Sequence, residues 1–96
     1  MRPMEIERLR WLPANEDKLR QHGITRDEVE AMIQRDEWAV LVHSAYPDQV
    51  RVIGPTAAGR FITVAVEPTG DPVEWRPITG WEASPSERAY YWEEYR

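Results

Sequence analysis

Apolar and polar side chains alternate through the middle of the chain, over residues 49–81. Successive side chains of a strand point to opposite faces of the sheet. Val50 and Val52 therefore fall on one face of a predicted strand, and Arg51 and Ile53 fall on the other. The stretch is the part of the chain around which the other elements are expected to pack.

Two turns divide this stretch into three strands. The sequence from Pro55 to Gly59 predicts the first turn, and a strand over Phe61 to Glu67 follows it. The sequence PTGDP at 68–72 predicts the second turn, followed by a strand over Val73 to Ile78. Because Pro77 has no backbone N–H to donate, it indicates an edge strand or a bulge.

Upstream of the hairpin, the pattern predicts a short strand and a helix. Apolar residues alternate with glutamates at the start of the chain, which predicts a strand from Met4 up to Trp11. Pro13 suits the first position of a helix, and Gly23 suits the left-handed position after its end. These signals predict a helix over residues 13–22.

A second helix has clearer signals. Thr25 and Glu28 have the spacing of a capping box, and Ile24 is placed to pack onto Val29. The apolar face repeats at helical spacing, and the helix is expected to end near residue 34 or 35.

One more strand and one more helix complete the predicted order. The apolar block within Glu37 to His43 predicts a buried strand, and the loop SAYPDQ follows it. Ser84 to Glu87 forms a second capping box with a proline at the first helical position. The helix it begins carries Tyr91, Trp92 and Tyr95 on one side. The order βααββββα predicts one α+β domain over residues 1–96, with a small antiparallel sheet, two N-terminal helices and one C-terminal helix.

Composition restricts the functions that this domain can have. The net charge is −5, from 12 basic and 17 acidic residues, which argues against nonspecific binding of nucleic acid. Eleven of the twelve basic residues are arginine, which suits bidentate phosphate contacts in a local cleft. The acidic balance also suits a basic protein partner.

Cysteine is absent and the two histidines are far apart, so neither a metal nor a cofactor is expected. The longest apolar run is too short for a membrane span, and no secretory segment opens the chain, so a cytoplasmic location is expected.

Three arginines form the most interesting group of candidate functional residues. Arg51, Arg60 and Arg76 lie on neighbouring predicted strands and would bind phosphates if they converged on one face. They are equally open to interpretation as ordinary solvated side chains. His22 ends a helix, where it acts as a cap or as a general acid or base. Glu87 is explained by its capping box without a catalytic role.

Several segments together resemble the BrnT family, small toxins of bacterial type II toxin–antitoxin systems. The segment WLPANEDKLRQHGI, followed by TRDEV, is similar to the family's opening, W-D-P-x-K, N-L-x-K-H-G and a short acidic helix. The end of the chain is similar to the family's R-I-I-S-A-R-x-A-T-x-x-E-R-x-x-Y. The positions that carry the likeness in the middle and at the end are Arg51, Ile53, Gly54, Arg60, Arg76, Ala83, Ser84, Glu87, Arg88 and Tyr91.

The resemblance implies a RelE-like ribonuclease fold and an RNA-cleaving activity that needs no metal. In this family the ribose 2′-hydroxyl attacks the phosphate, and basic side chains stabilise the transition state. Carried over by position, Arg60 and Arg76 with His22 would be catalytic, while Arg51, Lys18 and Trp81 would bind RNA. The family's partner is a ribbon-helix-helix antitoxin, through which the toxin forms higher assemblies.

This chain departs from the family pattern at several positions. Leu12 replaces an aspartate, and positive charge is lost at Asn15, Gln21 and Trp81 and regained at Lys18. Trp81 stands where the family has the arginine of S-A-R. Its indole is suited either to stacking on an unpaired base or to packing.

Three functional hypotheses follow. The first is an RNA-cleaving BrnT-like toxin held by an antitoxin. The second is a catalytically weakened relative that acts as a protein-interaction module without ribonuclease activity. The third is an unrelated α+β domain with scattered surface arginines.

Overall fold

The computed structural model describes residues 4–42 and 49–94. Three predicted features fall wholly or mostly outside this part of the chain: the strand end at His43, the loop SAYPDQ, and Tyr95 on the last helix.

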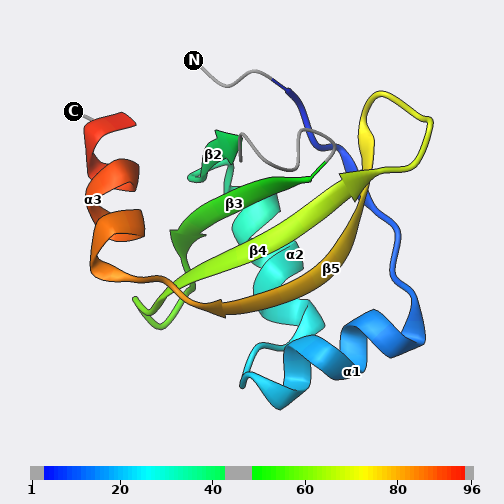
Figure 1. The fold of residues 1–96 in the computed structure, drawn as a ribbon, viewed down its shortest axis with the longest axis horizontal. Helices are drawn as coiled ribbons and strands as arrows, with labels where there is room; N and C mark the ends of the chain where they lie inside the picture. The colour runs from blue at the N-terminus through cyan, green and yellow to red at the C-terminus, as the bar shows by residue number, and fades with distance from the viewer. Residues whose placement is uncertain (1–3, 43–48, 95–96) are drawn as a thin grey trace.

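The predicted order βααββββα is confirmed, and the domain belongs to the α+β class (Figure 1). The sheet has five strands in the order β1-β5-β4-β3-β2. All pairings are antiparallel except that of β1 with β5, which is parallel. The elements are β1 (Arg8–Leu9), α1 (Pro13–Gln21), α2 (Arg26–Arg35), β2 (Ala39–Val42), β3 (Val50–Pro55), β4 (Phe61–Pro68), β5 (Glu74–Glu82) and α3 (Pro85–Glu94).

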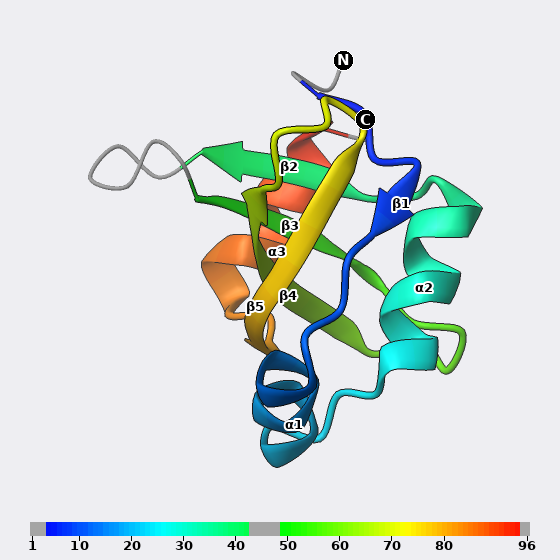
Figure 2. The same cartoon turned by 90° about the vertical axis from the view of Figure 1, so that its right-hand side faces the viewer.

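Helices cover both faces of the sheet. Figure 2 shows α2 on one side of the strands and α3 on the other, with α1 at the end of the sheet nearest β5. The alternation of side chains along β3 explains this arrangement, because Val50 and Val52 point toward α1 and α2 while Ile53 points toward α3. The larger of the two hydrophobic clusters lies on the α1 and α2 side.

Both predicted capping boxes are present and fix where two helices begin. The backbone N–H of Glu28 donates to the Thr25 hydroxyl oxygen at 3.2 Å, and the Thr25 N–H donates to the Glu28 carboxylate at 3.0 Å. Ser84 and Glu87 make the same pair of bonds at the start of α3, at 3.1 and 2.8 Å. Each box satisfies backbone donors that a helix leaves unpaired at its first turn.

The bounds of two predicted strands in the first half of the chain are wrong. The first strand covers Arg8–Leu9 and not residues 4–11, because only this dipeptide aligns with the start of β5 while Ile6 turns into the core. The strand predicted over residues 37–43 begins only at Ala39.

The last strand is longer than predicted and contains a bulge. Ala65 pairs with Thr79 but its neighbour Val66 pairs with Pro77, so Ile78 is the extra residue. The bulge accommodates the missing N–H of the proline, and β5 then continues to Glu82. The alternative of a bulge at Pro77 is therefore confirmed.

Close packing of α1 on the sheet depends on Gly80. A Cβ atom built at this position would lie 2.7 Å from Cδ2 of Leu19 and 2.9 Å from the carbonyl oxygen of Thr63. The absence of a side chain on this face of β5 lets the fully buried Leu19 reach the strand. In the described part of the chain, no helix is long and apolar enough to span a membrane.

Candidate functional site

A pocket opens where α3 meets the sheet, and Arg51 lies in it. Arg51 is the second residue of β3, with Leu41 of β2 and Ala65 of β4 as its pairing neighbours. The alternation along β3 turns its side chain toward the α3 face, where one third of it is exposed. The pocket has a volume of about 450 Å³, and we call it the Arg51 pocket. It is lined by Leu41, Arg51, Trp81, Ser84, Ser86 and Glu87.

Glu87 brings a buried carboxylate to this pocket. Its side chain is only 7% exposed, although it carries a charge. Its Oε1 accepts hydrogen bonds from the backbone N–H of Ser84 at 2.8 Å and from the indole N–H of Trp81 at 3.1 Å. Burial alone raises the pKa of Glu87, but these donors, together with the nearby hydroxyls of Thr63 and Ser84, outweigh it and hold the pKa below its ordinary value. Glu87 is therefore ionised at neutral pH.

Arg51 joins the carboxylate and the indole into one cluster. Its Nη1 lies 3.5 Å from Oε2 of Glu87. Its guanidinium carbon lies 5.3 Å from the ring centroid of Trp81, within the range of a cation–π contact. The cluster combines a flat aromatic surface, a planar cation and a fixed anion, with two serine hydroxyls at its rim.

Arg60 lies elsewhere in the fold. Its Nη2 donates to the carbonyl oxygen of Gly23 at 2.8 Å and lies 3.2 Å from both carboxylate oxygens of Glu28. These partners are at the start of α2, on the sheet face opposite α3 (Figure 2). Arg60 is not among the residues that line the Arg51 pocket.

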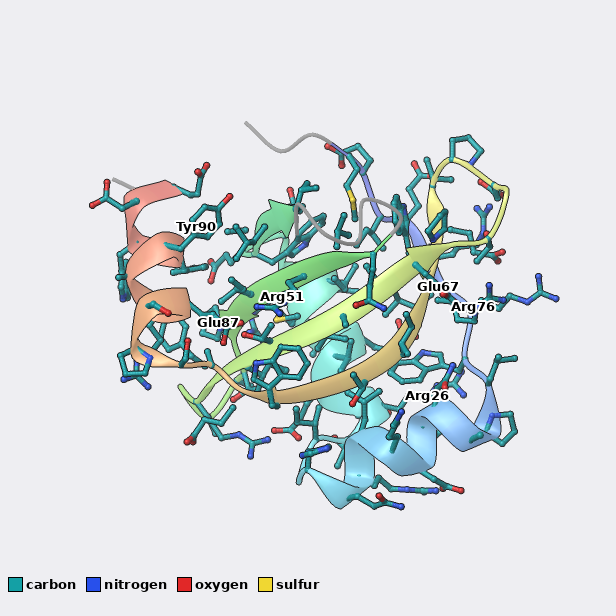
Figure 3. The ribbon with its side chains drawn as sticks, viewed as in Figure 1. Arg26, Arg51, Glu67, Arg76, Glu87 and Tyr90 are labelled. Carbon is teal, nitrogen blue, oxygen red and sulfur yellow. The ribbon has the colours of Figure 1, made fainter. Side chains whose placement is uncertain are left out.

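Arg76 also has its own partner. Its Nε donates to the Glu67 carboxylate at 2.7 Å, from the position directly across the β4–β5 pairing. Figure 3 shows this pair toward the opposite end of the sheet from Arg51 and Glu87. Each of the three candidate arginines therefore forms an ion pair with a different carboxylate, and the structure does not gather them in one cleft.

The two remaining basic candidates belong to α1. Lys18 is exposed on the helix surface, and His22 is exposed directly after its last turn. The His22 backbone N–H donates to the Leu19 carbonyl oxygen at 3.0 Å, which makes His22 the predicted C-cap through its main chain. Since Gly23 follows, His22 is next in sequence to the carbonyl that Arg60 binds.

The structure brings together two of the predicted site residues, Arg51 and Trp81. The sequence explains Glu87 by its capping box and does not predict that it joins their cluster. Its contact with Arg51, which is 36 positions away in sequence, depends on tertiary packing that no local pattern indicates. In the part of the chain that the structure describes, no group of three or more histidine and acidic side chains is placed to hold a metal ion.

Comparison with known proteins gives one informative structural likeness. No protein-family model and no curated protein matches the chain. A crystal structure of the Brucella abortus ribonuclease toxin BrnT superposes with a TM-score of 0.59, covering 80% of this chain and 96% of that one. The chain has the BrnT fold. The two sequences are 21% identical over the match, so the resemblance to BrnT is confirmed for the fold.

Three elements of the fold carry the cluster. Arg51 lies on β3, Trp81 lies on β5 and Glu87 lies in the first turn of α3.

Proposed function

We propose that the protein is the toxin component of a bacterial type II toxin–antitoxin system, a metal-independent ribonuclease. The observation that carries this proposal is the BrnT fold, which matches 96% of a ribonuclease toxin. A second observation supports it, because Arg51 and Trp81 share one open pocket. An arginine beside a partly exposed aromatic ring is suited to binding unpaired nucleotides.

The proposed chemistry is an intramolecular transesterification at a phosphate of the RNA backbone. The ribose 2′-hydroxyl loses its proton to a base and attacks the adjacent phosphorus, and the bond to the 5′-oxygen breaks. A proton returns to that oxygen, and a 2′,3′-cyclic phosphate remains. Arg60 would stabilise the charge on the reacting phosphate near His22, which would transfer protons. Arg76, which lies elsewhere in the fold, would contact a different phosphate of the RNA. Lys18 would add a contact to the RNA backbone.

Binding RNA in this way requires the arginines to exchange partners. Arg60 would release Glu28, and Arg76 would release Glu67, so that each contacts a phosphate instead. Both pairs are partly exposed, with side-chain exposures between 26% and 40%. Partly exposed ion pairs contribute little net energy, so this exchange costs little.

The proposed partner is a ribbon-helix-helix antitoxin that neutralises the toxin in the cytoplasm and links toxin copies into larger assemblies. The charge of −5 suits a partner with a basic surface, because opposite charges steer association.

A second candidate function is a protein-interaction module without ribonuclease activity. The observation that favours it is the pairing of Arg51, Arg60 and Arg76 with three separate carboxylates. Preorganised positive charge is the main catalytic resource of a metal-free ribonuclease, and these pairs neutralise it.

Induced expression in a bacterial host tests both candidates. Growth and the integrity of cellular RNA are followed for the unchanged protein, for Arg60→Ala and Arg76→Ala, and for Arg10→Ala, an exposed arginine outside the proposed site. A ribonuclease toxin arrests growth and cleaves RNA, and either site variant abolishes both effects while Arg10→Ala retains them. Normal growth and intact RNA with soluble, folded protein would exclude the ribonuclease and favour the interaction module.

A further inference from the structure

The Arg51 pocket is a poor place for a phosphate because it already contains a buried anion. The Glu87 carboxylate is only 7% exposed, and the donors around it keep it ionised. Arg51 supplies one positive charge, which this carboxylate offsets. A phosphate in the pocket would approach a fixed like charge in a medium of low dielectric, where repulsion is strong.

The same pocket offers a flat surface to a planar ligand. The guanidinium of Arg51 lies over the Trp81 ring, 5.3 Å from its centroid. A planar ring placed beside the guanidinium would continue this stack across the indole. Every nucleobase has such a face, and stacking on aromatic side chains is the usual way in which proteins bind unpaired bases.

The edge of the pocket offers a hydrogen-bond donor next to an acceptor. Nη1 of Arg51 and Oε2 of Glu87 are 3.5 Å apart, well beyond the length of about 2.7–2.9 Å usual for a charged pair. The pair is therefore loose. Nη1 carries two N–H donors and each carboxylate oxygen has two lone pairs, so both atoms retain capacity for a further partner. Oε1 of Glu87, in contrast, already accepts two hydrogen bonds.

We propose that the Arg51 pocket binds a single unstacked nucleobase by its Watson–Crick edge and does not bind a phosphate. The base is one that presents a carbonyl oxygen beside an imino N–H, as guanine and uracil do. The carbonyl accepts from Arg51, and the imino N–H donates to Glu87 while the ring stacks on Trp81. This inference rests on the proposed function, which makes RNA the source of the base.

Adenine and cytosine present an amine and a ring nitrogen instead. An amine is a weaker donor to a carboxylate than an imino N–H, and a ring nitrogen replaces the carbonyl as the acceptor from Arg51. The pocket therefore distinguishes the two kinds of base through charge-assisted hydrogen bonds, which are the strongest that side chains make.

Titration with nucleosides tests the proposal on the purified full chain without any need for catalysis. The probes are two matched pairs, inosine with adenosine and uridine with cytidine, together with inorganic phosphate. Binding is followed by NMR through the indole N–H signal of Trp81, identified by its loss in Trp81→Phe. We expect inosine and uridine to shift this signal with dissociation constants at least about fivefold below those of adenosine and cytidine. Phosphate is expected to leave it in place.

Two variants separate edge recognition from simple stacking. Glu87→Gln preserves the length of the side chain and removes the charged acceptor. Glutamine is also suited to this position of a capping box. It should reduce the preference within each pair to less than about twofold. Glu67→Gln changes the carboxylate of a different ion pair and should leave the preference unchanged.

Three results would overturn the inference: equal affinity within each matched pair, saturable movement of the Trp81 signal by phosphate, or no binding of any nucleoside. Its failure is distinguishable from failure of the proposed function. RNA cleavage in cells without a base preference rejects the base pocket alone. A base preference without RNA cleavage retains the pocket and rejects the ribonuclease.

Discussion

Nη2 of Arg60 lies 3.2 Å from both carboxylate oxygens of Glu28, which joins the turn before β4 to the first turn of α2. The same nitrogen donates to the Gly23 carbonyl, so the Arg60 side chain stabilises the connection between α1 and α2. Arg60, a candidate catalytic residue, therefore also has a structural role. The structural role predicts an effect on stability, and the catalytic role predicts an effect on RNA cleavage.

Arg60→Ala should lower the free energy of unfolding by about 1 kcal/mol, because it removes one hydrogen bond to a carbonyl and a half-exposed ion pair. Urea denaturation of this variant beside Arg10→Ala measures the difference. A cycle with Glu28→Gln isolates the pair, and the two effects should not be additive. An unchanged midpoint in Arg60→Ala would show that the contact contributes nothing to stability.

Glu67→Gln should strengthen RNA binding. The substitution removes the charge that faces Arg76 at 2.7 Å and leaves the guanidinium free for a phosphate. We expect affinity for single-stranded RNA to rise a few-fold at low salt, because the basic side chain no longer competes with a local anion. Fluorescence anisotropy with labelled RNA measures this, and Asp17→Asn, on the exposed surface of α1, is the control. Equal gains in both variants would mean that overall charge is responsible.

Glu87 should make stability depend on pH in the acidic range. Its pKa in the folded protein is below its ordinary value of 4.5. The folded state therefore binds the proton less readily than the unfolded state, and this contribution is fully present above pH 4.5. It is lost as the pH falls through the lower folded pKa. We expect denaturation at several pH values from 6 to 3 to show a smaller loss of stability in Glu87→Gln than in the unchanged protein. If the free energy of unfolding has the same slope against pH in both proteins, Glu87 is not the group responsible.

Tyr90→Phe should loosen the edge of the sheet. The Tyr90 hydroxyl donates to the carbonyl oxygen of Val40 in the edge strand β2. The phenylalanine keeps the ring and removes the hydroxyl that makes this bond, so stability should fall by about 1 kcal/mol. Hydrogen exchange should become faster in β2 and stay unchanged in β4, at the centre of the sheet. Equal protection of β2 in both proteins would show that the bond does not stabilise the edge.

Gly80→Ala should be more destabilising than an ordinary surface substitution. The new methyl group would lie 2.7 Å from a Leu19 carbon and 2.9 Å from a backbone oxygen, so α1 would have to move. Overpacking of this kind costs about 1–3 kcal/mol. Gly59→Ala is a useful comparison, because that position has no atom within 4 Å but a φ of +87°. Backbone strain alone should account for the loss of stability in Gly59→Ala, and the NMR signals of α1 should stay unchanged.

Local signals predicted most of the fold. The two capping boxes, the proline and glycine that bound α1, and the alternation of Val50 and Val52 each depend on chemistry within a few residues. Strand lengths at the ends of the chain were not predictable in this way. The extent of β1 depends on which residues meet β5, which is more than sixty positions away in sequence.

The site was harder to predict than the fold. The alternation of side chains along the strand placed Arg51 on the same face as Ile53. It did not show which carboxylate Arg51 would contact. The partners of Arg51, Arg60 and Arg76 come from two helices and a neighbouring strand. Such contacts are set by tertiary packing, which a single sequence does not encode in its periodicity. The contact between Arg51 and Trp81 was not predictable either, because the predicted strand ended at Ile78 and left Trp81 outside it.

The pairing of each candidate arginine with its own carboxylate has a consequence for the thermodynamics of RNA binding. A protein that presents free cations displaces the ions condensed on a nucleic acid, and its affinity falls steeply as salt concentration rises. Here Arg60 and Arg76 would each contact a phosphate by exchanging one anion for another, and the number of ions displaced would be small. Association would then depend on stacking and shape, and it would persist at salt concentrations that dissociate a basic RNA-binding protein.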